Sequence, residues 1–320
     1  MSYLDRVVQR EALADHDGRS GARVERGVLD DGTAVIVKTA SPANDVTIAL
    51  TGGVDRERLL WESGVFGRLA GAVAHPILEV TRVGEETITV MRDVGDTIPG
   101  WTRRMRARDC ERIMAALAAL HRVFLDDAPE VACRLELRLA ALSPVTAQAN
   151  AALGNPVLDA ISDGWQRFFE LVGGDVASAV ASIHDDPTPL ANAMRRGPVT
   201  LCHADLWPVN VALEPDQVVF LDWAIATAAP PALDLAVFLT GSASQMEPSR
   251  EDAIAMFRAV SPAADDDAVA LALLFGLADM GWNKALDATG HSDAATRARE
   301  RADLDWWVTH GAAALDRALL

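Results

Sequence analysis

The residues best suited to chemistry lie in one short stretch, residues 201–210 (LCHADLWPVN), which is soon followed by residues 218–223 (VVFLDW). The first segment reads as a tight polar loop and the second as a short buried strand that ends in a carboxylate. Asp205, Asn210 and Asp222 could converge there. The side-chain oxygens of Asn210 and Asp222 suit Mg²⁺, a hard cation that prefers oxygen ligands. Asp205 would then be free to act on an incoming hydroxyl, which is the layout that phosphoryl transfer from a magnesium nucleotide requires.

A cation for the nucleotide phosphates could come from the N-terminal part of the chain. Residues 33–38 (TAVIVK) are rich in β-branched side chains and predict a strand that ends in Lys38. Residues 55–69 place apolar side chains roughly on one face and predict a helix that carries Glu62. An ion pair between Lys38 and Glu62 would aim the lysine at phosphates. Taken in isolation, a strand and a helix of this kind more often carry two unrelated surface charges.

A flexible turn precedes these elements. Residues 17–21 (DGRSG) contain Ser20, and the residues that follow predict a strand at 22–29 and a hairpin turn at 30–32. A turn of Ser and Gly clamped between strands can present backbone N–H groups to phosphates. An ordinary hairpin is at least as good an interpretation of this segment.

The remaining elements suggest two domains. Residues 1–14 predict a short amphipathic helix, and residues 87–91 (TITVM) predict a further strand. The connector after that strand is a good seat for an adenine, which needs backbone hydrogen bonds rather than a special side chain. We therefore expect a β-rich nucleotide-binding part at residues 1–95 and a helical part at residues 96–320, which carries the polar loop and the acceptor site.

The polar loop is expected to lie among helices. Residues 199–201 predict an apolar strand whose hairpin partner is residues 218–221. Helices are predicted on both sides of this hairpin, at residues 109–124, 134–142, 156–172, 175–183, 187–196, 230–236, 250–260, 266–289 and 294–319.

Composition places the chain among globular proteins. Its 320 residues are 50% hydrophobic and 23% charged, which argues against disorder. It has no run of about 18 uninterrupted apolar residues, so no membrane-spanning helix and no membrane partner are expected. The N-terminus lacks the basic and apolar segments of a secretory signal. Cys110, Cys133 and Cys202 are isolated, which fits a reducing cytoplasm.

The net charge of −17 bears on the partner. A nucleic acid needs a basic binding surface, so none is expected. The charge favours a cationic small molecule through electrostatic steering. An acidic surface that merely keeps the protein soluble has the same composition.

Taken together, these residues resemble the aminoglycoside phosphotransferase and choline kinase family, small-molecule kinases that are related to protein kinases. The resemblance covers roughly residues 15–240 and implies an α+β fold of two lobes, a small β-rich N-terminal lobe and a mostly helical C-terminal lobe. It is carried by residues 201–210, 220–223 (FLDW), 234–236 (DLA) and 117–121 (LAALH), and by Lys38 and Glu62.

The resemblance also assigns roles. It implies that Asp205 is the catalytic base and that Asn210 and Asp222 hold Mg²⁺. It implies an ATP or GTP site formed by Ser20, by Lys38 with Glu62, and by the backbone of Arg92 and Val94. His203 and Asp234 would brace the loop. Only about a dozen residues separate Asp222 from the next helix, so an activation segment of the protein-kinase type is absent and a protein substrate is disfavoured.

Residues for the acceptor should lie in the C-terminal helices, where the family builds that site. Asp279, Trp282, Asn283 and Asp287 are spaced i, i+3, i+4 and i+8, so they share one helix face. Carboxylates beside an aromatic ring suit a cationic or sugar-like acceptor. A solvated helix face is an equally good interpretation.

The function predicted is therefore ATP- or GTP-dependent O-phosphotransfer to a small, cationic or sugar-containing molecule, with an aminoglycoside or another antibiotic as the leading acceptor. A metabolic kinase for choline, an amino sugar or a similar alcohol is the alternative. The alternative from another class is a kinase-like protein that binds nucleotide without catalysis. The oligomeric state and the choice between ATP and GTP stay open.

Overall fold

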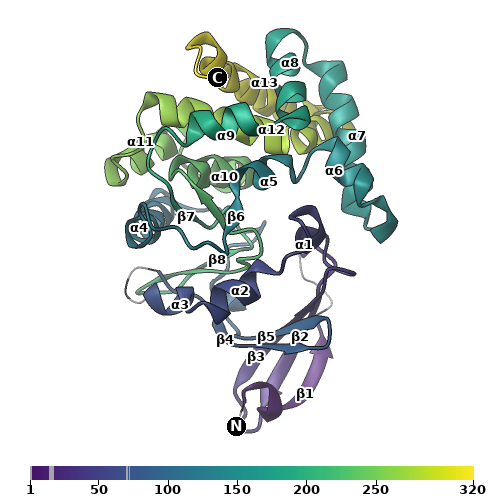
Figure 1. The fold of residues 1–320 in the computed structure, drawn as a ribbon, viewed down its shortest axis with the longest axis vertical. Coiled ribbons are helices and arrows are strands. Elements are labelled where there is room, and N and C mark those ends of the chain that lie inside the picture. Colours follow the sequence, from purple (N-terminus) through teal and green to yellow (C-terminus); the bar gives the residue numbers. More distant parts are fainter. Residues whose placement is uncertain (1, 14–17, 70, 72) are drawn as a thin grey trace.

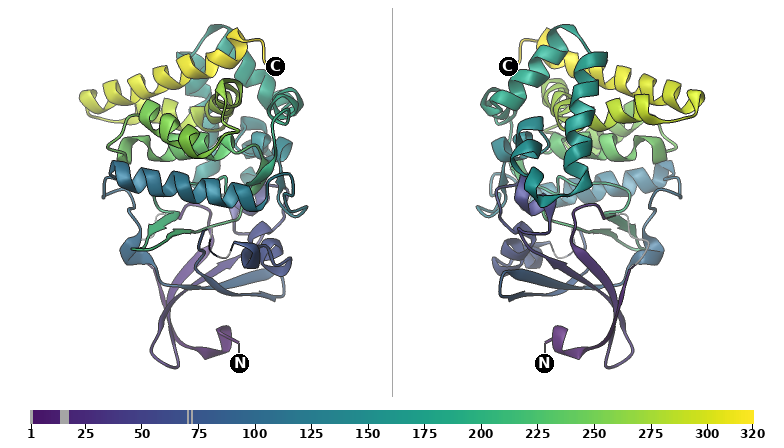
Figure 2. Two further views of the ribbon diagram at one scale, coloured as in Figure 1. Left: turned by 90° about the vertical axis from the view of Figure 1, so that its left-hand side faces the viewer. Right: turned by 90° about the vertical axis from the view of Figure 1, so that its right-hand side faces the viewer.

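The computed structural model describes residues 2–13, 18–69, 71 and 73–320, and it divides into a sheet and a helical body. Figure 1 shows the sheet at the N-terminal end and the helices stacked at the other end, with short strands between them. The side views of Figure 2 show the same division. The expected mixed α+β architecture of a small β-rich N-terminal lobe and a mostly helical C-terminal lobe is therefore confirmed.

The N-terminal sheet has five antiparallel strands in the order β1-β2-β3-β5-β4. β3 lies at its centre, so Lys38 has a neighbour on either side, Val24 on β2 and Thr89 on β5. The β-branched residues that fill β3 suit this central position. The strands are β1 (Val7–Ala12), β2 (Arg23–Leu29), β3 (Ala34–Ala40), β4 (Ile77–Val83) and β5 (Glu86–Arg92).

Two predictions for the N-terminal lobe were wrong. The helix predicted at residues 1–14, of which residues 1 and 14 lie outside the described residues, is a single 3₁₀ turn, η1 (Leu4–Arg6), followed by β1. Its apolar residues do not form a buried face, since Val8 is 68% exposed, and pairing with β2 decides the conformation instead. The helix predicted at residues 55–69 is two helices, because Gly64 with φ 75° ends the first one.

Those two helices are α2 (Arg56–Glu62) and α3 (Val65–Arg68), which lie against the sheet. A further short helix, α1 (Val46–Leu50), was not predicted, and neither was β4. α1 begins at Asp45, whose carboxylate caps it by accepting from the backbone N–H groups of Thr47 and Ile48 at 2.8 and 3.2 Å.

The strand pairing around the polar loop also differs from the prediction. β7 (Thr200–Cys202) does not pair with β9 (Val218–Phe220); it pairs antiparallel with β10 (Thr227–Ala229). β9 instead forms a hairpin with β8 (Val211–Leu213), a strand that was not predicted. β6 (Cys133–Arg134) runs parallel to β10. The polar loop is therefore the crossing from one small sheet to another, which pins both of its ends.

The two lobes are joined at the β8–β9 hairpin. The Ala74 N–H donates to the Val218 carbonyl at 3.0 Å, and the Phe220 N–H donates to the Ala74 carbonyl at 3.0 Å. β5 ends at Arg92 and is followed by a 3₁₀ turn, η2 (Gly95–Thr97). The predicted boundary at residue 95 falls in this turn and stays a prediction.

The C-terminal lobe packs around one buried helix, α12. By length and composition α12 could cross a membrane, but 89% of its most apolar window is buried inside the protein, which is typical of a core helix. The helices of the C-terminal lobe are α4 (Ala107–Val123), α5 (Leu135–Ala140), α6 (Pro144–Ala149), η3 (Ala151–Leu153), α7 (Pro156–Leu171), α8 (Gly174–Asp185), α9 (Thr188–Met194), α10 (Ala232–Ser242), η4 (Ala243–Gln245), α11 (Arg250–Val260), α12 (Asp266–Gly290) and α13 (Ala294–Asp316).

Candidate active site

The polar loop is held in a strained conformation by one buried carboxylate. Ala204 has φ 64° and Asp222 has φ 58°, the left-handed region that side chains other than Gly rarely adopt. Asp234, at the start of α10, accepts the His203 N–H at 3.0 Å and the Ala204 N–H at 2.7 Å. Residues in such conformations persist where the surroundings over-determine them, which is common at active sites.

Two histidines complete this brace. His121 at the end of α4 bonds through Nε2 to Asp234 Oδ2 at 2.8 Å. His203 is fully buried, its Nδ1 accepts the Asp205 N–H at 3.3 Å, and its ring packs edge-on against Trp223 with centroids 4.6 Å apart. Burial lowers the pKa of His203, which favours the neutral ring that this acceptor bond needs. The geometry therefore supports the bracing role for His203 and Asp234.

Asp205 and Asn210 come from the two ends of the loop and meet. Asn210 Nδ2 donates to Asp205 Oδ2 at 2.8 Å and to the Asp205 backbone carbonyl at 2.9 Å. The backbone of Asn210 is fixed by the hairpin, because its carbonyl accepts the Leu221 N–H at 2.9 Å. Asp222 follows Leu221 directly, so the pairing of β8 with β9 brings Asp222 next to Asn210 in the fold. Asp222 is also near enough to Asp205 for its charge to act on that carboxyl group.

Lys38 joins this group from the other lobe. Its Nζ lies 2.8 Å from Asp222 Oδ1, across 184 residues of sequence. Its second partner is Glu57 on α2, with Nζ 3.9 Å from Glu57 Oε1. Glu57 also accepts the Trp223 N–H at 3.1 Å, so it links the lysine to the backbone that follows Asp222. A lysine held between two carboxylates is positioned at the junction of the lobes.

The predicted partner of Lys38 was wrong. Glu62 is 52% exposed and pairs with Arg58 on the outer face of α2, with 2.7 Å between Arg58 NH1 and Glu62 Oε2. The signal that could have identified Glu57 is its place three residues before Leu60, which is fully buried. Residues at i and i+3 lie on the same face of a helix, whereas Glu62 lies on the face of Arg58.

Mutual repulsion and burial set the protonation states of the site. Burial, and next the charge of Asp222, raise the pKa of Asp205 to about 7, although Arg138 and Lys38 oppose the shift. Burial would raise the pKa of Asp222 too, but the charge and hydrogen bond of Lys38 lower it overall. Burial works to lower the pKa of Lys38, yet the charges of Asp222, Glu57 and Asp45 raise it. Asp205 and Asp222 therefore differ, with Asp205 the more basic of the two carboxylates.

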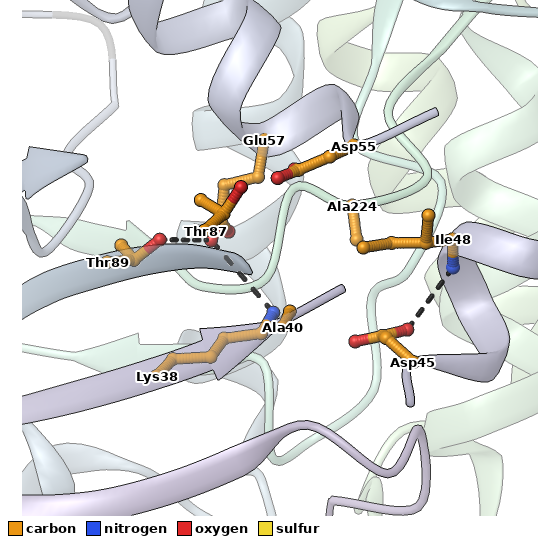
Figure 3. Close-up of a pocket in the computed structure, with 9 residues that line it drawn as sticks. All are labelled: Lys38, Ala40, Asp45, Ile48, Asp55, Glu57, Thr87, Thr89 and Ala224. Carbon is orange, nitrogen blue, oxygen red and sulfur yellow. Dashed lines mark hydrogen bonds and ion pairs between the residues drawn. The ribbon is translucent and has the colours of Figure 1, made fainter. Parts of the chain in front are cut away.

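A third carboxylate near Lys38 was not predicted. Asp45 is 1% exposed, and burial raises its pKa while the charge of Lys38 opposes the shift. Figure 3 shows the carboxyl groups of Asp45, Asp55 and Glu57 turned toward one small space beside Lys38. This cavity of about 10 Å³ has room for roughly one water molecule. Lys38 lines this cavity, and Asp45 adds negative charge to the surroundings of the lysine.

The predicted phosphate turn lies beside α1. Of residues 17–21, Asp17 lies outside the described residues. Ser20 Oγ accepts the Ala22 N–H at 3.3 Å, and the Ser20 carbonyl accepts the Val46 N–H at 2.7 Å. The turn is thus packed against the N-terminus of α1, whose cap is Asp45 near Lys38.

The predicted adenine residues lie at the connector between the lobes. The Arg92 N–H donates to the Pro76 carbonyl at 2.8 Å, and its guanidinium pairs with Glu214 at 2.8 Å. Val94 is buried against Ala212 and Val219 of the β8–β9 hairpin. The connector is therefore anchored on the same hairpin that carries Asn210 and Asp222.

The predicted acceptor residues do not share a solvated face. Asp279 is 3% exposed, and both of its oxygens bind the guanidinium of Arg138, with 2.8 Å between Arg138 NH2 and Asp279 Oδ2. Arg138 NH2 also reaches the Ala204 carbonyl at 3.4 Å. Trp282 is buried as well, whereas Asn283 and Asp287 are half-buried. Asp279 thus stabilises the polar loop through Arg138, a residue for which no role was predicted.

A comparison with protein families matches residues 14–273, more than half of the chain, to the family described as "Phosphotransferase enzyme family". The chain belongs to this family. It is a phosphotransferase of the aminoglycoside phosphotransferase and choline kinase type, a small-molecule kinase whose acceptor is a hydroxyl group. The predicted family and enzyme class are confirmed. None of the curated proteins matches the sequence significantly.

Solved structures share the protein-kinase-like fold at low identity. The choline kinase LicA from Streptococcus pneumoniae is 12% identical, with a TM-score of 0.52 over 96% of this chain and 95% of that one. A thermostable mutant of the aminoglycoside phosphotransferase APH(4)-Ia, in a ternary complex with ADP and hygromycin B, is 13% identical, with a TM-score of 0.53 and coverages of 96% and 95%. APH(3'')-Id from Streptomyces rimosus, in complex with ADP and streptomycin, is 17% identical, with a TM-score of 0.52 and coverages of 83% and 94%.

Proposed function

We propose that this phosphotransferase moves the γ-phosphoryl group of ATP or GTP to a hydroxyl group of a small cationic molecule, with an aminoglycoside or another antibiotic as the first candidate. The observation that carries the proposal is the convergence of Asp205, Asn210 and Asp222 from one lobe with Lys38 from the other. The 2.8 Å contact between Lys38 and Asp222 supports the proposal, because phosphoryl transfer needs a cation for the phosphates close to a carboxylate that can hold a metal.

Asp205 would act on the acceptor. Its carboxylate lies at the loop end, and its raised pKa of about 7 makes it a better proton acceptor than an ordinary aspartate. The bond from Asn210 to Oδ2 fixes the orientation of the carboxylate. In this role Asp205 orients the acceptor hydroxyl and takes its proton as the oxygen attacks phosphorus.

Lys38 would contact the phosphates of the nucleotide. Glu57 and Asp222 keep its ammonium group charged and fix it at the lobe junction. Charge neutralisation and positioning supply most of the catalysis in phosphoryl transfer, since the protein does little covalent chemistry. The nucleotide would enter between the turn at Ser20 and the connector at Arg92 and Val94.

The residues present also fit Mg²⁺. Asn210 commits its amide nitrogen to Asp205, so its side-chain oxygen is the group that can turn to a cation. Asp222 commits Oδ1 to Lys38, and its side chain is still 34% exposed. An all-oxygen set of one amide and one carboxylate suits a small hard cation that keeps several waters. When bound there, Mg²⁺ would neutralise charge on the nucleotide phosphates.

The choice of a cationic acceptor is supported by charge. The chain carries a net charge of −17, which attracts cations toward its surface. Aminoglycosides, amino sugars and choline all combine a cation with a hydroxyl. The half-buried Asn283 and Asp287 of α12 stay candidates for contacting such an acceptor.

The direct test is a screen for nucleoside diphosphate release, with Mg²⁺–ATP and Mg²⁺–GTP, against aminoglycosides, other antibiotics, amino sugars and choline-like alcohols. We expect turnover with at least one aminoglycoside. Turnover with choline-like alcohols alone would replace the antibiotic proposal by the metabolic one. A flat screen with intact nucleotide binding would favour a kinase-like protein without catalysis.

The role of Asp205 is tested by Asp205→Asn, which keeps the shape of the side chain. We expect the turnover number to fall by at least about a thousandfold, as for loss of a positioned base, while Mg²⁺–ATP still binds. A variant that retains near-wild-type turnover would show that Asp205 is not the base.

A further inference from the structure

One side chain of the C-terminal lobe binds the turn that precedes β2. Asn155 Nδ2 donates to the carbonyl oxygens of Arg19 at 3.1 Å and Ser20 at 3.3 Å. Asn155 is the N-cap of α7, and its Oδ1 accepts the Val157 N–H at 2.9 Å. The same amide therefore caps a helix with its oxygen and holds the turn with its nitrogen.

The turn is held from its other side by the N-terminal lobe. The Ser20 carbonyl accepts from the Val46 N–H of α1 at 2.7 Å as well as from Asn155. Gly21 has φ +94°, and a Cβ at this position would lie 2.2 Å from the Asn44 carbonyl oxygen. Only glycine fits there. The backbone of the turn is thus held between α1 and Asn155, the N-cap residue of α7.

The helix that Asn155 caps, α7, connects the turn with the rest of the C-terminal lobe. α7 packs closely on α12, since a Cβ on Gly164 would lie 2.5 Å from the Trp282 carbonyl oxygen. α12 also carries Asp279, which binds Arg138 and through it the catalytic loop. A series of contacts therefore connects the turn at Ser20, through α7 and α12, with the loop that carries Asp205.

We propose that Asn155 is a positioning residue for the nucleotide: its two donated hydrogen bonds hold the turn at residues 18–21 closed over the phosphate end of the site. The proposal rests on the proposed function, because it takes this turn to cover the nucleotide phosphates. It goes further by assigning closure of the turn to the C-terminal lobe. In this proposal, the contact between the turn and the C-terminal lobe also helps to retain the nucleotide.

The variant Asn155→Asp separates the two roles of this side chain. Aspartate is as good an N-cap as asparagine, so the bond from Val157 and the stability of α7 are kept. A carboxylate has no N–H to donate, and its charge repels the carbonyl oxygens of Arg19 and Ser20. We expect the Kd of Mg²⁺–AMP-PNP in calorimetry, and the KM for nucleotide, to rise about five- to tenfold, as for the loss of two hydrogen bonds.

The turnover number at saturating nucleotide should stay within about twofold, and the Tm within about 2 °C, because the cap is retained. Amide hydrogen exchange at Ala22 and Val46 should become faster in the unliganded variant. The matched control is Asn150→Asp, the same substitution at the end of α6. Asn150 Nδ2 donates at 2.9 Å to the Thr146 carbonyl of its own helix, so this change should alter neither binding nor exchange.

A second variant, Asn155→Ser, keeps a capping oxygen and removes the amide without adding charge, and it should weaken nucleotide binding as well. Unchanged nucleotide affinity in both variants, with wild-type binding intact, would overturn the role of Asn155 alone. A wild-type protein that binds none of Mg²⁺–ATP, Mg²⁺–GTP and Mg²⁺–AMP-PNP would overturn the proposed function together with it.

Discussion

The assignment of Glu57 rather than Glu62 to Lys38 gives a sharp prediction. At 3.9 Å, two unit charges interact by about 4 kcal/mol at an effective dielectric constant of about 20. Lys38 keeps Asp222 at 2.8 Å in the variant Glu57→Gln, so part of this positioning survives. We expect a loss of about 2–3 kcal/mol in transition-state stabilisation, which lowers kcat/KM by about 30- to 150-fold. Glutamine keeps an oxygen for the Trp223 N–H, so the fold should be retained.

The matched control is Glu62→Gln on the same helix. Its ion pair with Arg58 is an exposed i, i+4 pair, which contributes only about 0.3–0.5 kcal/mol. The assay is phosphotransfer to the acceptor found in the screen, with Mg²⁺–ATP titrated by calorimetry as a readout that needs no acceptor. A larger loss in Glu62→Gln than in Glu57→Gln, or full activity in Glu57→Gln, would refute the positioning of Lys38 by Glu57.

Two further predictions follow from the buried charges. Arg138→Met leaves the Asp279 carboxylate buried without its cation, so the free energy of unfolding in urea should fall by about 3–5 kcal/mol. Adding Asp279→Leu should restore most of that stability, because the buried carboxylate is then gone as well. It should not restore the activity, because the Ala204 carbonyl still lacks its contact with the guanidinium of Arg138. Equal stability of the single and double variants would contradict this prediction. The pKa of about 7 for Asp205 means that the folded protein keeps a proton which the unfolded chain releases above about pH 4. Between about pH 4 and 7 the metal-free wild type should therefore lose stability relative to Asp205→Asn as the pH rises, and a stability difference between the two proteins that does not change with pH would contradict the raised pKa.

The candidate site residues of the C-terminal lobe could be picked out from the sequence because they are close in sequence. Asp205, Asn210 and Asp222 lie on one loop and the hairpin after it, so residue type and spacing alone bring them near one another. The strand that carries Lys38 could be predicted from its β-branched residues, which indicate a central strand.

The predictions that were wrong depend on contacts between distant residues, which sequence spacing does not reveal. The N-terminal strand β1 has a helix-like apolar pattern, and only pairing with β2 makes it a strand. Asp279 looked like a binding residue on a helix face because its partner, Arg138, lies 141 residues away. A buried carboxylate needs a partner, and the sequence does not say which cation supplies it.

By itself the sequence determined the reaction class, because a loop with Asp205 and Asn210, a strand that leads to Asp222 and a strand lysine are patterns that residue type and spacing can reveal. Only the tertiary structure decided how these groups are positioned. Glu57 is selected over Glu62 by the direction in which α2 packs, and Asn155 meets the turn at Ser20 across 135 residues of chain. Such contacts arise where separate elements meet, so they depend on the packing of the whole fold rather than on any one segment.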